Sequence, residues 1–357
     1  MHETVASLKV DYYQFLGADG KPTSEQLPAL AQDLEQLEEF YRLMSLTRTF
    51  DKKAIALQRT GRLGTYASCL GHEAAHVAIG AAMRKEDCLA PMYREYGAQF
   101  YRGVRMSEVL AYWGGDERGN DFSGPAHDFA WSVPIATQAL HGAGAALAFK
   151  LRDEKRVAVA VVGDGGSSKG DFLEAINAAS AFKLPLVLVI VNNQWAISVP
   201  RAQQNRAATL AQKGVAGGLP SIQVDGNDIL ACHWAMEKAV ERARFGNGAS
   251  VIEMLTYRLS DHTTADDAKR YRDDEEVQAA WRRDPLTRLR EYLSDRGSWT
   301  NDREQRLADD CSSQVDAAVD EYLNTEPQPI ESMFDFMHGD MPEDLRAQRE
   351  RAIEESK

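Results

Sequence analysis

The sequence predicts an α/β fold, a doubly wound parallel sheet with helical flanks at its N- and C-terminal ends. Two observations predict it. Strand-like runs alternate with helix-like stretches, and the runs at 157–162 and 186–191 are continuously apolar. Such runs are typical of strands that are buried on both faces of a parallel sheet. Hydrophobic residues make up 44% of the 357 residues, which allows a large core.

The first half of the chain is mostly helical by pattern. After residues 1–34, which we interpret as an N-terminal arm, apolar residues recur at helical spacing until Gly61 and Gly64 end the helix. The stretch GHEAAHVAIGAAM (71–83) predicts a second, buried helix because small residues dominate it.

A further helix is predicted for TQALHGAGAALAFKLR (137–152), with Gly142 and Gly144 in its middle. A glycine inside a helix costs about 1 kcal/mol relative to alanine. We therefore expect this segment to pack closely against another helix, and to suit an interface between subunits.

The second half alternates between strand and helix. The predicted order is strand 157–162, helix 171–183, strand 186–191, a short strand in SIQVDGND, helix ILACHWAMEKAVERARF and strand SVIEMLTYRL. We assign residues 35–275 to the α/β domain and 276–357 to a C-terminal helical region.

Composition excludes several classes of protein. The formal charge of −13 argues against a nucleic-acid partner, and no apolar run is long enough to span a membrane. The N-terminal residues lack the apolar core of a signal peptide. The cysteines at 69, 88, 232 and 311 have no CxxC spacing, which indicates reduced thiols. These features predict a cytoplasmic protein.

Polar residues follow the two most apolar strands. Asp164 stands among Gly163, Gly165 and Gly166 after one strand, and Asn193 follows the other. Parallel sheets bind ligands at the carboxyl ends of their strands, and a helix N-terminus there suits phosphate. Carboxylate and amide oxygens suit Mg²⁺, which shares its coordination shell with phosphates. The pattern predicts a cradle for a metal ion and a diphosphate, although GDG alone would be explained by a turn.

Other motifs predict less. The sequence has no GxxxxGK[ST], and the dinucleotide fingerprint is incomplete at 142–146, which argues against a nicotinamide dehydrogenase. His72, Glu73 and His76 formally satisfy HExxH, the signature of a zinc hydrolase, but no third ligand follows convincingly.

The combined motifs resemble the alpha subunit of the two-subunit 2-oxo acid dehydrogenases, from about residue 35 to 350. GDG followed by NN, with Asp164 and Asn193 29 positions apart, resembles the thiamine-diphosphate motif. The other matching segments are YREYG, GDGGSSKGDFLEAIN, NNQWAIS, TLAQKGVAGGLPSIQVDGND and DHTTADDAKRYR. The resemblance implies the thiamine-diphosphate-binding fold. It also implies thiamine diphosphate and Mg²⁺ as cofactors.

The resemblance assigns the family's cofactor contacts to the matching positions of this sequence. Asp164, Asn193 and the main-chain carbonyl of Trp195 resemble the Mg²⁺ ligands, with tryptophan where relatives often have tyrosine. Gly163, Gly165 and Gly166 would line the diphosphate.

The remaining cofactor contacts come from two other segments. Tyr93 and Arg94 resemble diphosphate contacts, and arginine matches phosphate oxygens bidentately. Val133 and Ile135 resemble residues that lie against the cofactor. Ser132, Thr137 and Gln138 align more weakly with a monovalent-cation loop of some relatives.

His262 ends the last predicted strand and begins a polar loop. On its own, a histidine there is often only a loop residue. The resemblance implies that it lies beside the diphosphate, orders the loop and assists proton transfer, which makes it the catalytic residue. Thr263 stands where relatives regulated by a kinase have a serine, so we do not expect that control here.

The resemblance implies an α2β2 heterotetramer. The glutamate that activates the cofactor's pyrimidine ring belongs to a second α/β domain, for which 357 residues leave no room. We therefore expect it on a beta subunit. The implied activity is decarboxylation of a small 2-oxo acid and reductive acylation of the lipoyl group on an acyltransferase. Pyruvate is the first choice, a branched-chain 2-oxo acid remains an alternative, and a non-catalytic cofactor-binding subunit is a remote one.

Overall fold

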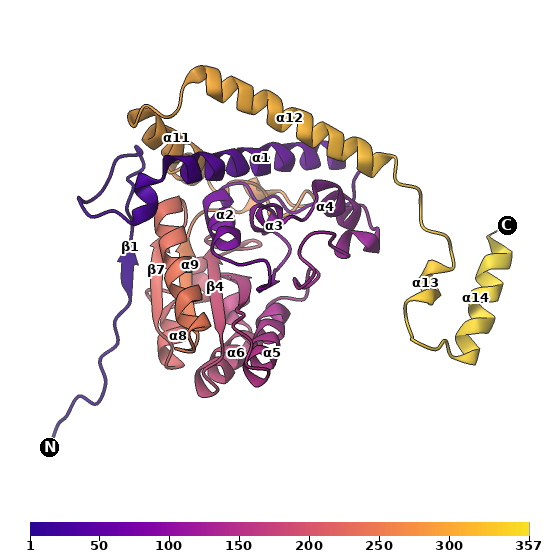
Figure 1. The fold of residues 1–357 in the computed structure, drawn as a ribbon, viewed down its shortest axis with the longest axis horizontal. Coiled ribbons are helices and arrows are strands. Elements are labelled where there is room, and N and C mark those ends of the chain that lie inside the picture. The colour runs from indigo at the N-terminus through magenta and orange to yellow at the C-terminus, as the bar shows by residue number, and fades with distance from the viewer. Residues whose placement is uncertain (357) are drawn as a thin grey trace.

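A six-stranded parallel sheet forms the centre of the protein (Figure 1). The structure is a computed structural model that describes residues 1–356. The sheet order is β1-β7-β8-β4-β3-β2. The strands are β1 (Asp11–Tyr13), β2 (Cys88–Ala90), β3 (Ala158–Gly163), β4 (Leu186–Asn192), β7 (Ser221–Asp225) and β8 (Ser250–Leu255), and the hairpin β5 (Trp195–Ala196) and β6 (Val199–Pro200) lies outside the sheet. The predicted fold class is confirmed.

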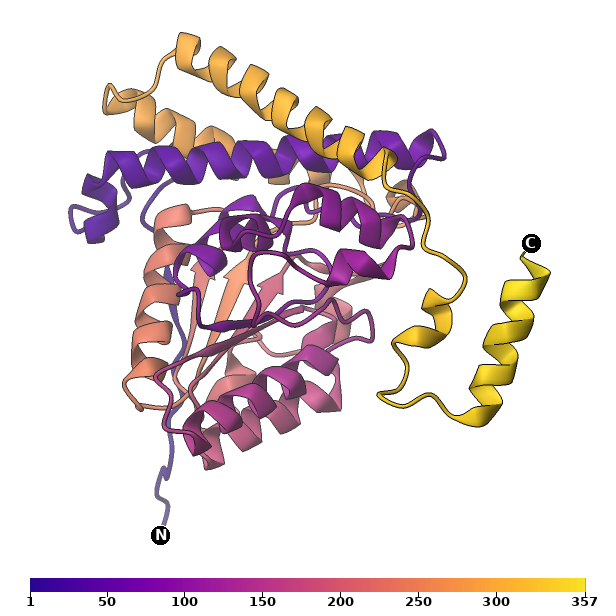
Figure 2. The same cartoon turned by 45° about the vertical axis from the view of Figure 1, so that its right-hand side comes forward.

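Helices cover both faces of this sheet, with α5 and α6 side by side on one face (Figure 2). The helices are α1 (Leu34–Arg59), α2 (Glu73–Ala81), α3 (Tyr96–Arg102), α4 (Met106–Trp113), α5 (Thr137–Leu151), α6 (Gly170–Ala181), α7 (Arg201–Gln204), α8 (Gln212–Ala216), α9 (Ile229–Arg244), α10 (Asp274–Trp281), α11 (Pro285–Asp295), α12 (Asn301–Leu323), α13 (Ser332–Asp335) and α14 (Glu343–Glu355). The strands and helices predicted for the second half are confirmed with shifts of one or two residues at most ends, but the strand predicted in SVIEMLTYRL (250–259) ends four residues earlier, at Leu255.

The apolar strands are buried on both faces, as their sequences predicted. Val159 and Val161 of β3 point into the core shared with α1, α2 and α9. Ala160 and Val162 of the same strand point into the core shared with α5 and α6. Because strand side chains alternate between faces, a strand covered on both sides must be apolar at every position.

The N-terminal arm contributes more than the sequence predicted. Asp11–Tyr13 pairs with β7 as an edge strand of the sheet. The carboxylate of Asp228 caps the start of α9 and also accepts the backbone N–H groups of Phe15 and Leu16 at 2.6 and 2.8 Å. One buried carboxylate therefore fastens the arm to the domain.

The glycine-containing helix α5 packs against another helix, α6, as predicted, but the close approach at Gly142 is to the sheet. A Cβ atom at Gly142 would lie 2.9 Å from the Cβ of Ala160, so this glycine lets α5 approach the sheet rather than a helix. A Cβ atom at Gly144 would meet nothing within 4 Å, and this residue is exposed.

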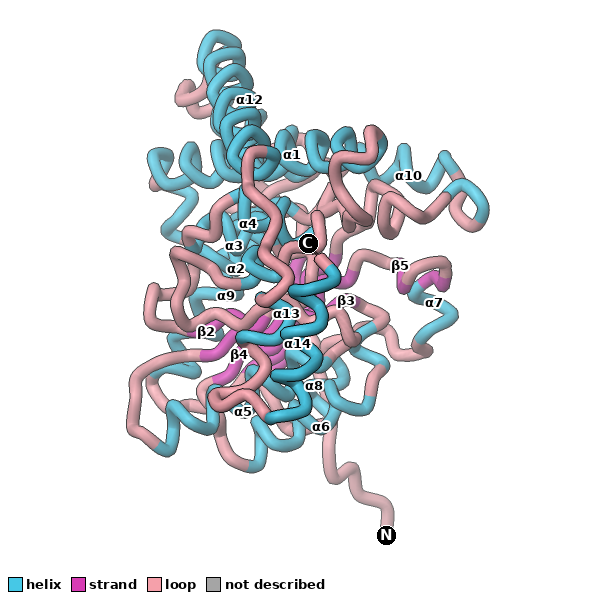
Figure 3. Tube along the Cα trace, turned by 90° about the vertical axis from the view of Figure 1, so that its right-hand side faces the viewer, coloured by secondary structure: helices cyan, strands magenta, loops and turns pink. Residues whose placement is uncertain are grey.

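The C-terminal helices take two different positions. α12 packs along α1, where Tyr41 donates to the Glu304 carboxylate at 2.9 Å and Lys53 pairs with Asp316 at 2.6 Å. α13 and α14 lie apart from the body in Figures 1 and 2, and in the view of Figure 3 they lie in front of it. None of the helices in residues 1–356 combines the length and apolar character needed to cross a membrane.

Candidate active site

Three neighbouring strands deliver the predicted polar residues to one edge of the sheet. Asp164 follows β3, Asn193 follows β4, and the chain that follows β8 leads to His262. Beyond β8, the backbone N–H of Arg258 donates to the carbonyl of Asn193 at 3.1 Å. The adjacency predicted for the two strand ends is therefore present, and β8 adds the histidine loop beside them.

Asp164 is a buried carboxylate whose hydrogen-bonding partners are neutral. Its side chain is 2% exposed and accepts a hydrogen bond from Nε2 of Gln204 at 2.8 Å. Burial raises the pKa of Asp164, and hydrogen bonds from Gln204 and from backbone N–H groups, including that of Asn193, counteract the rise only partly. A divalent cation would stabilise this carboxylate in its ionised form.

The loop after β4 folds back tightly against the loop after β3. Gln194 and Ile197, on either side of Trp195, have positive φ angles of 74° and 54°. A β-branched residue in that region is strained, and such strain concentrates at functional sites. A Cβ atom at Gly165 would lie 2.6 Å from the Cβ of Ala196, so only glycine allows this contact between the two loops.

Arg94 belongs to the YREYG segment and lies buried against the histidine loop. Its side chain donates to the carbonyl oxygen of Ser68 and, at 3.0 Å, to that of His262. Its Nε has no partner, although the residue is only 3% exposed. A buried guanidinium with an unused donor fits an anionic ligand such as a phosphate group.

His262 is held from several directions. Its Nδ1 lies 3.3 Å from Nη2 of Arg94 and 3.4 Å from Nη1 of Arg258, and its backbone N–H donates to Asp266 at 2.9 Å. Burial, followed by the charges of both guanidinium groups, lowers the pKa of His262 to about 3. The imidazole is therefore neutral near pH 7.

A cavity of about 720 Å³ opens beside His262. Its wall is formed by Thr65, Tyr93, Tyr112, Trp113, Gly115, Asp116, Glu117, Asn120, Val133, Ile135, His262 and Thr263. This wall therefore brings together four predicted site residues from three separate segments, Tyr93, Val133, Ile135 and His262. Val133 and Ile135 remain 52% and 39% exposed, so this apolar part of the wall is open.

The remaining predicted residues are placed as follows. Gly163 ends β3, and a Cβ atom at Gly166 would lie 3.5 Å from Cγ2 of Ile135, which brings the glycine turn to the cavity wall. Gln138 is buried and donates to the carbonyl of Val161 at 2.7 Å, while its Oε1 has no partner. Ser132 and Thr137 are partly buried near the start of α5.

The HExxH segment does not form a metal centre in this structure. Glu73 pairs with Arg48 at 2.8 Å, and His72 and His76 are completely buried. Burial, helped by the charge of Arg94, lowers the pKa of His76 to about 3. Across residues 1–356, no three histidine, cysteine, aspartate or glutamate side chains are grouped to bind a metal ion. The zinc hydrolase alternative therefore has no support.

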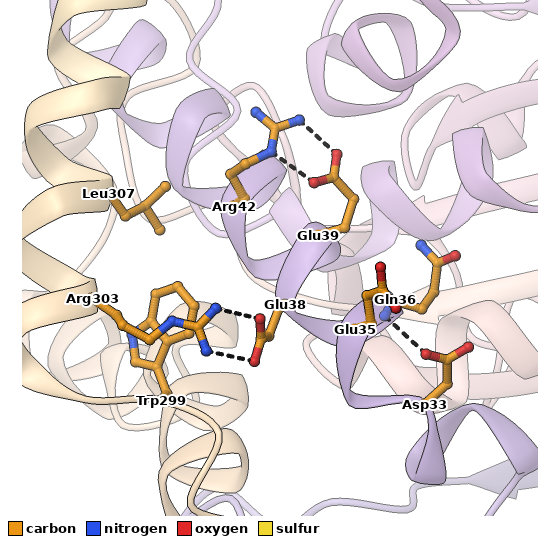
Figure 4. A pocket seen from close by; sticks show the side chains of 9 residues that line it. All are labelled: Asp33, Glu35, Gln36, Glu38, Glu39, Arg42, Trp299, Arg303 and Leu307. Carbon is orange, nitrogen blue, oxygen red and sulfur yellow. Dashed lines mark hydrogen bonds and ion pairs between the residues drawn. The ribbon is translucent and has the colours of Figure 1, made fainter.

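A second hollow, of about 610 Å³, lies between α1 and α12 (Figure 4). Its charges are largely paired with one another, Glu38 with Arg303 and Glu39 with Arg42. It shares no residue with the cavity beside His262. We therefore assign it no chemical role.

Sequence reasoning missed two residues of the site. Gln204 contacts the Asp164 carboxylate from a short helix, and Arg258 contacts His262 from the segment that follows β8. Neither belongs to a motif that indicates chemistry. The arginine four positions before His262 was the one available signal, and its burial appears only in three dimensions.

The chain is similar to proteins of known activity. The family model described as "Dehydrogenase E1 component" matches residues 41–331. "Pyruvate dehydrogenase E1 component subunit alpha" of Staphylococcus epidermidis is 42% identical over 344 residues, covering 96% of this chain and 92% of that protein. "3-methyl-2-oxobutanoate dehydrogenase subunit alpha" of Mycobacterium tuberculosis is 40% identical over 345 residues, covering 97% of this chain and 94% of that protein.

Proposed function

The chain belongs to the dehydrogenase E1 component family, and we propose from this that it is the alpha subunit of a thiamine-diphosphate-dependent 2-oxo acid dehydrogenase. The observation that carries the proposal is a buried carboxylate and a buried guanidinium group at the same edge of the sheet. Asp164 is a buried carboxylate whose hydrogen-bonding partners are neutral, and Arg94 is a buried guanidinium with an unused donor. Mg²⁺ and a diphosphate would satisfy both.

We propose that this chain holds the diphosphate end of the cofactor. Asp164, Asn193 and the carbonyl of Trp195 coordinate Mg²⁺, and the backbone N–H groups of Gly165 and Gly166 face phosphate oxygens. The short distance between the glycine turn and Ala196 supports this arrangement because it keeps the two ligand-bearing loops together.

Tyr93 and Arg94 contact the diphosphate, Val133 and Ile135 lie against the rest of the cofactor in the cavity, and His262 contributes an N–H beside the diphosphate. When bound, thiamine diphosphate supplies the nucleophilic carbon and the electron sink that decarboxylation of a 2-oxo acid requires. Val133 and Ile135 are exposed in the isolated chain, so water would leave this apolar part of the cavity only when the cofactor or a partner subunit covers it.

We propose pyruvate as the substrate, with 3-methyl-2-oxobutanoate as the alternative. Relatives with each of these names are 42% and 40% identical to the chain, a difference too small to decide between them. The pyruvate motif TLAQKGVAGGLPSIQVDG supports the first choice.

The assembled enzyme is expected to prefer pyruvate by about 10-fold or more in kcat/KM, because a pocket distinguishes one methylene by about 10- to 200-fold. The measurement is reduction of an artificial electron acceptor with each 2-oxo acid, with 2-oxobutanoate as the intermediate size. A higher kcat/KM for 3-methyl-2-oxobutanoate would establish the branched-chain alternative. Activity with none of these acids would contradict the proposed function.

We propose a beta subunit as the partner in an α2β2 heterotetramer, and a lipoyl-bearing acyltransferase as the acceptor of the acyl group. The exposed apolar residues Val133 and Ile135 support a partner surface at the cavity mouth. The cytoplasm is the proposed location, supported by cysteines that are all free and buried.

A further inference from the structure

Arg258, at the end of the chain segment that extends β8, is a completely buried arginine. All three of its guanidinium nitrogens contact neutral groups. Nε donates to the carbonyl of Ser260 at 3.2 Å, Nη2 donates to the carbonyl of Ile197 at 3.0 Å and to Oη of Tyr271 at 2.7 Å, and Nη1 lies 3.4 Å from Nδ1 of His262. Burying a charged group among neutral partners is costly, so its retention calls for a role.

The contact with His262 has one consistent protonation pattern. A guanidinium group carries only donors, and two of them, from Arg94 and Arg258, face Nδ1. Nδ1 must therefore accept, and the single proton of the neutral ring lies on Nε2. Asp266 binds the backbone N–H of His262 rather than its ring, and the Tyr93 ring stands edge-on with its centroid 6.4 Å away. Neither of these neighbours offers an acceptor to Nδ1.

We propose that Arg258 is a positioning residue that fixes His262 in the tautomer with hydrogen on Nε2. The ring then presents an N–H donor to the cavity whose wall it forms. What that donor acts on rests on the proposed function: it is an oxygen of the diphosphate or of the 2-oxo acid, both of which accept hydrogen bonds. If the cofactor's diphosphate recruits Arg94, Arg258 becomes the main group that holds the tautomer.

Arg258 also connects the two loops of the site. Besides His262, it holds the carbonyl of Ile197, one of the two residues with a positive φ angle beside Trp195. Its own backbone N–H donates to the carbonyl of Asn193. One residue thus positions the histidine relative to the loop that carries two of the proposed metal ligands.

Nitrogen NMR on the full chain, assembled with its beta subunit and carrying ¹⁵N-histidine, tests the tautomer directly. The chain contains 8 histidines, and a His262→Gln variant identifies the signals of His262. We expect a protonated Nε2 and an unprotonated Nδ1 near pH 7. A protonated Nδ1 in the parent enzyme would overturn the proposal. This result does not depend on which substrate the enzyme accepts, so it fails or succeeds separately from the proposed function.

Variants at Arg258 test the positioning role. Arg258→Gln is expected to lower kcat by about 10- to 100-fold with little change in KM, as removal of supporting partners typically does, and to populate both tautomers. Arg258→Lys retains a donor and is expected to recover part of kcat. Arg272→Gln is the matched control, because Arg272 binds the carbonyls of Arg258, Leu259 and Ser260 but not the imidazole. Its His262 tautomer should remain that of the parent. A parent-like tautomer and kcat in Arg258→Gln would contradict the role.

Discussion

Replacing Asp164 with alanine in the assembled enzyme is expected to weaken binding of thiamine diphosphate with Mg²⁺ by about 100-fold or more. Loss of groups that merely support metal ligands already costs about 10- to 100-fold, and Asp164 is the one charged ligand among those proposed. At a cofactor concentration about 100 times the parent Kd, the parent gains about 2.7 kcal/mol of stability. A variant with about 100-fold weaker binding would gain only about 0.4 kcal/mol.

The stability of the enzyme without cofactor should respond differently. Because burial raises the folded-state pKa of Asp164, stability falls as the pH rises through the interval between its unfolded and folded pKa values. The ionised side chain is thus unfavourable near pH 7, and Asp164→Ala should leave the cofactor-free melting temperature unchanged or raise it. Asp309→Ala, which removes an exposed carboxylate on α12, is the control. Parent-like calorimetric binding in Asp164→Ala would contradict the metal assignment.

Without a beta subunit, the purified chain is expected to show no 2-oxo acid decarboxylation, even with saturating thiamine diphosphate and Mg²⁺. The cavity is open along Val133 and Ile135, and the glutamate that would act on the pyrimidine ring is expected on the partner. Loss of one acid–base group typically costs about 100- to 10,000-fold in rate. Titration with the beta subunit should restore activity and reach its end point at an equimolar ratio.

The cavity wall of this chain contains one glutamate that could act on the pyrimidine ring in place of a glutamate from the partner. Glu117 is the glutamate in the cavity wall, and Asp116 beside it is occupied by Arg118 and Gln328. A Glu117→Gln variant is therefore informative. Substantial activity of the isolated chain that disappears in Glu117→Gln would show that this subunit carries its own pyrimidine-side group.

The apolar strands and the residues at their ends could be predicted because the signal is local. β3 and β4 are apolar and buried up to their last residues, Gly163 and Asn192, and they pair in parallel. Parallel strands end at the same edge of a sheet, so their sequences alone predict that Asp164 and Asn193 lie close together. The role of His262 could be predicted only from the family resemblance, since the sequence of a polar loop does not show which residues lie next to it.

The errors arose where the identity of the packing partner is not encoded in the segment itself. A glycine shows that a helix makes a close approach, but not whether Gly142 meets a helix or, as here, Ala160 of the sheet. The three residues of β1 are too short for a pattern, and their segment is fastened by Asp228, more than 200 positions later. Arg258 acquires its role only because β8 runs beside β4.

The most direct test of the metal and diphosphate site is a crystal structure of the assembled enzyme with thiamine diphosphate and Mn²⁺ in place of Mg²⁺. Anomalous scattering locates the manganese ion independently of the surrounding chain. We expect one peak within coordination distance of oxygens of Asp164, Asn193 and the Trp195 carbonyl, with the diphosphate completing the shell. A manganese peak bound by other residues, or a diphosphate that lies away from Arg94 and His262, would contradict the account.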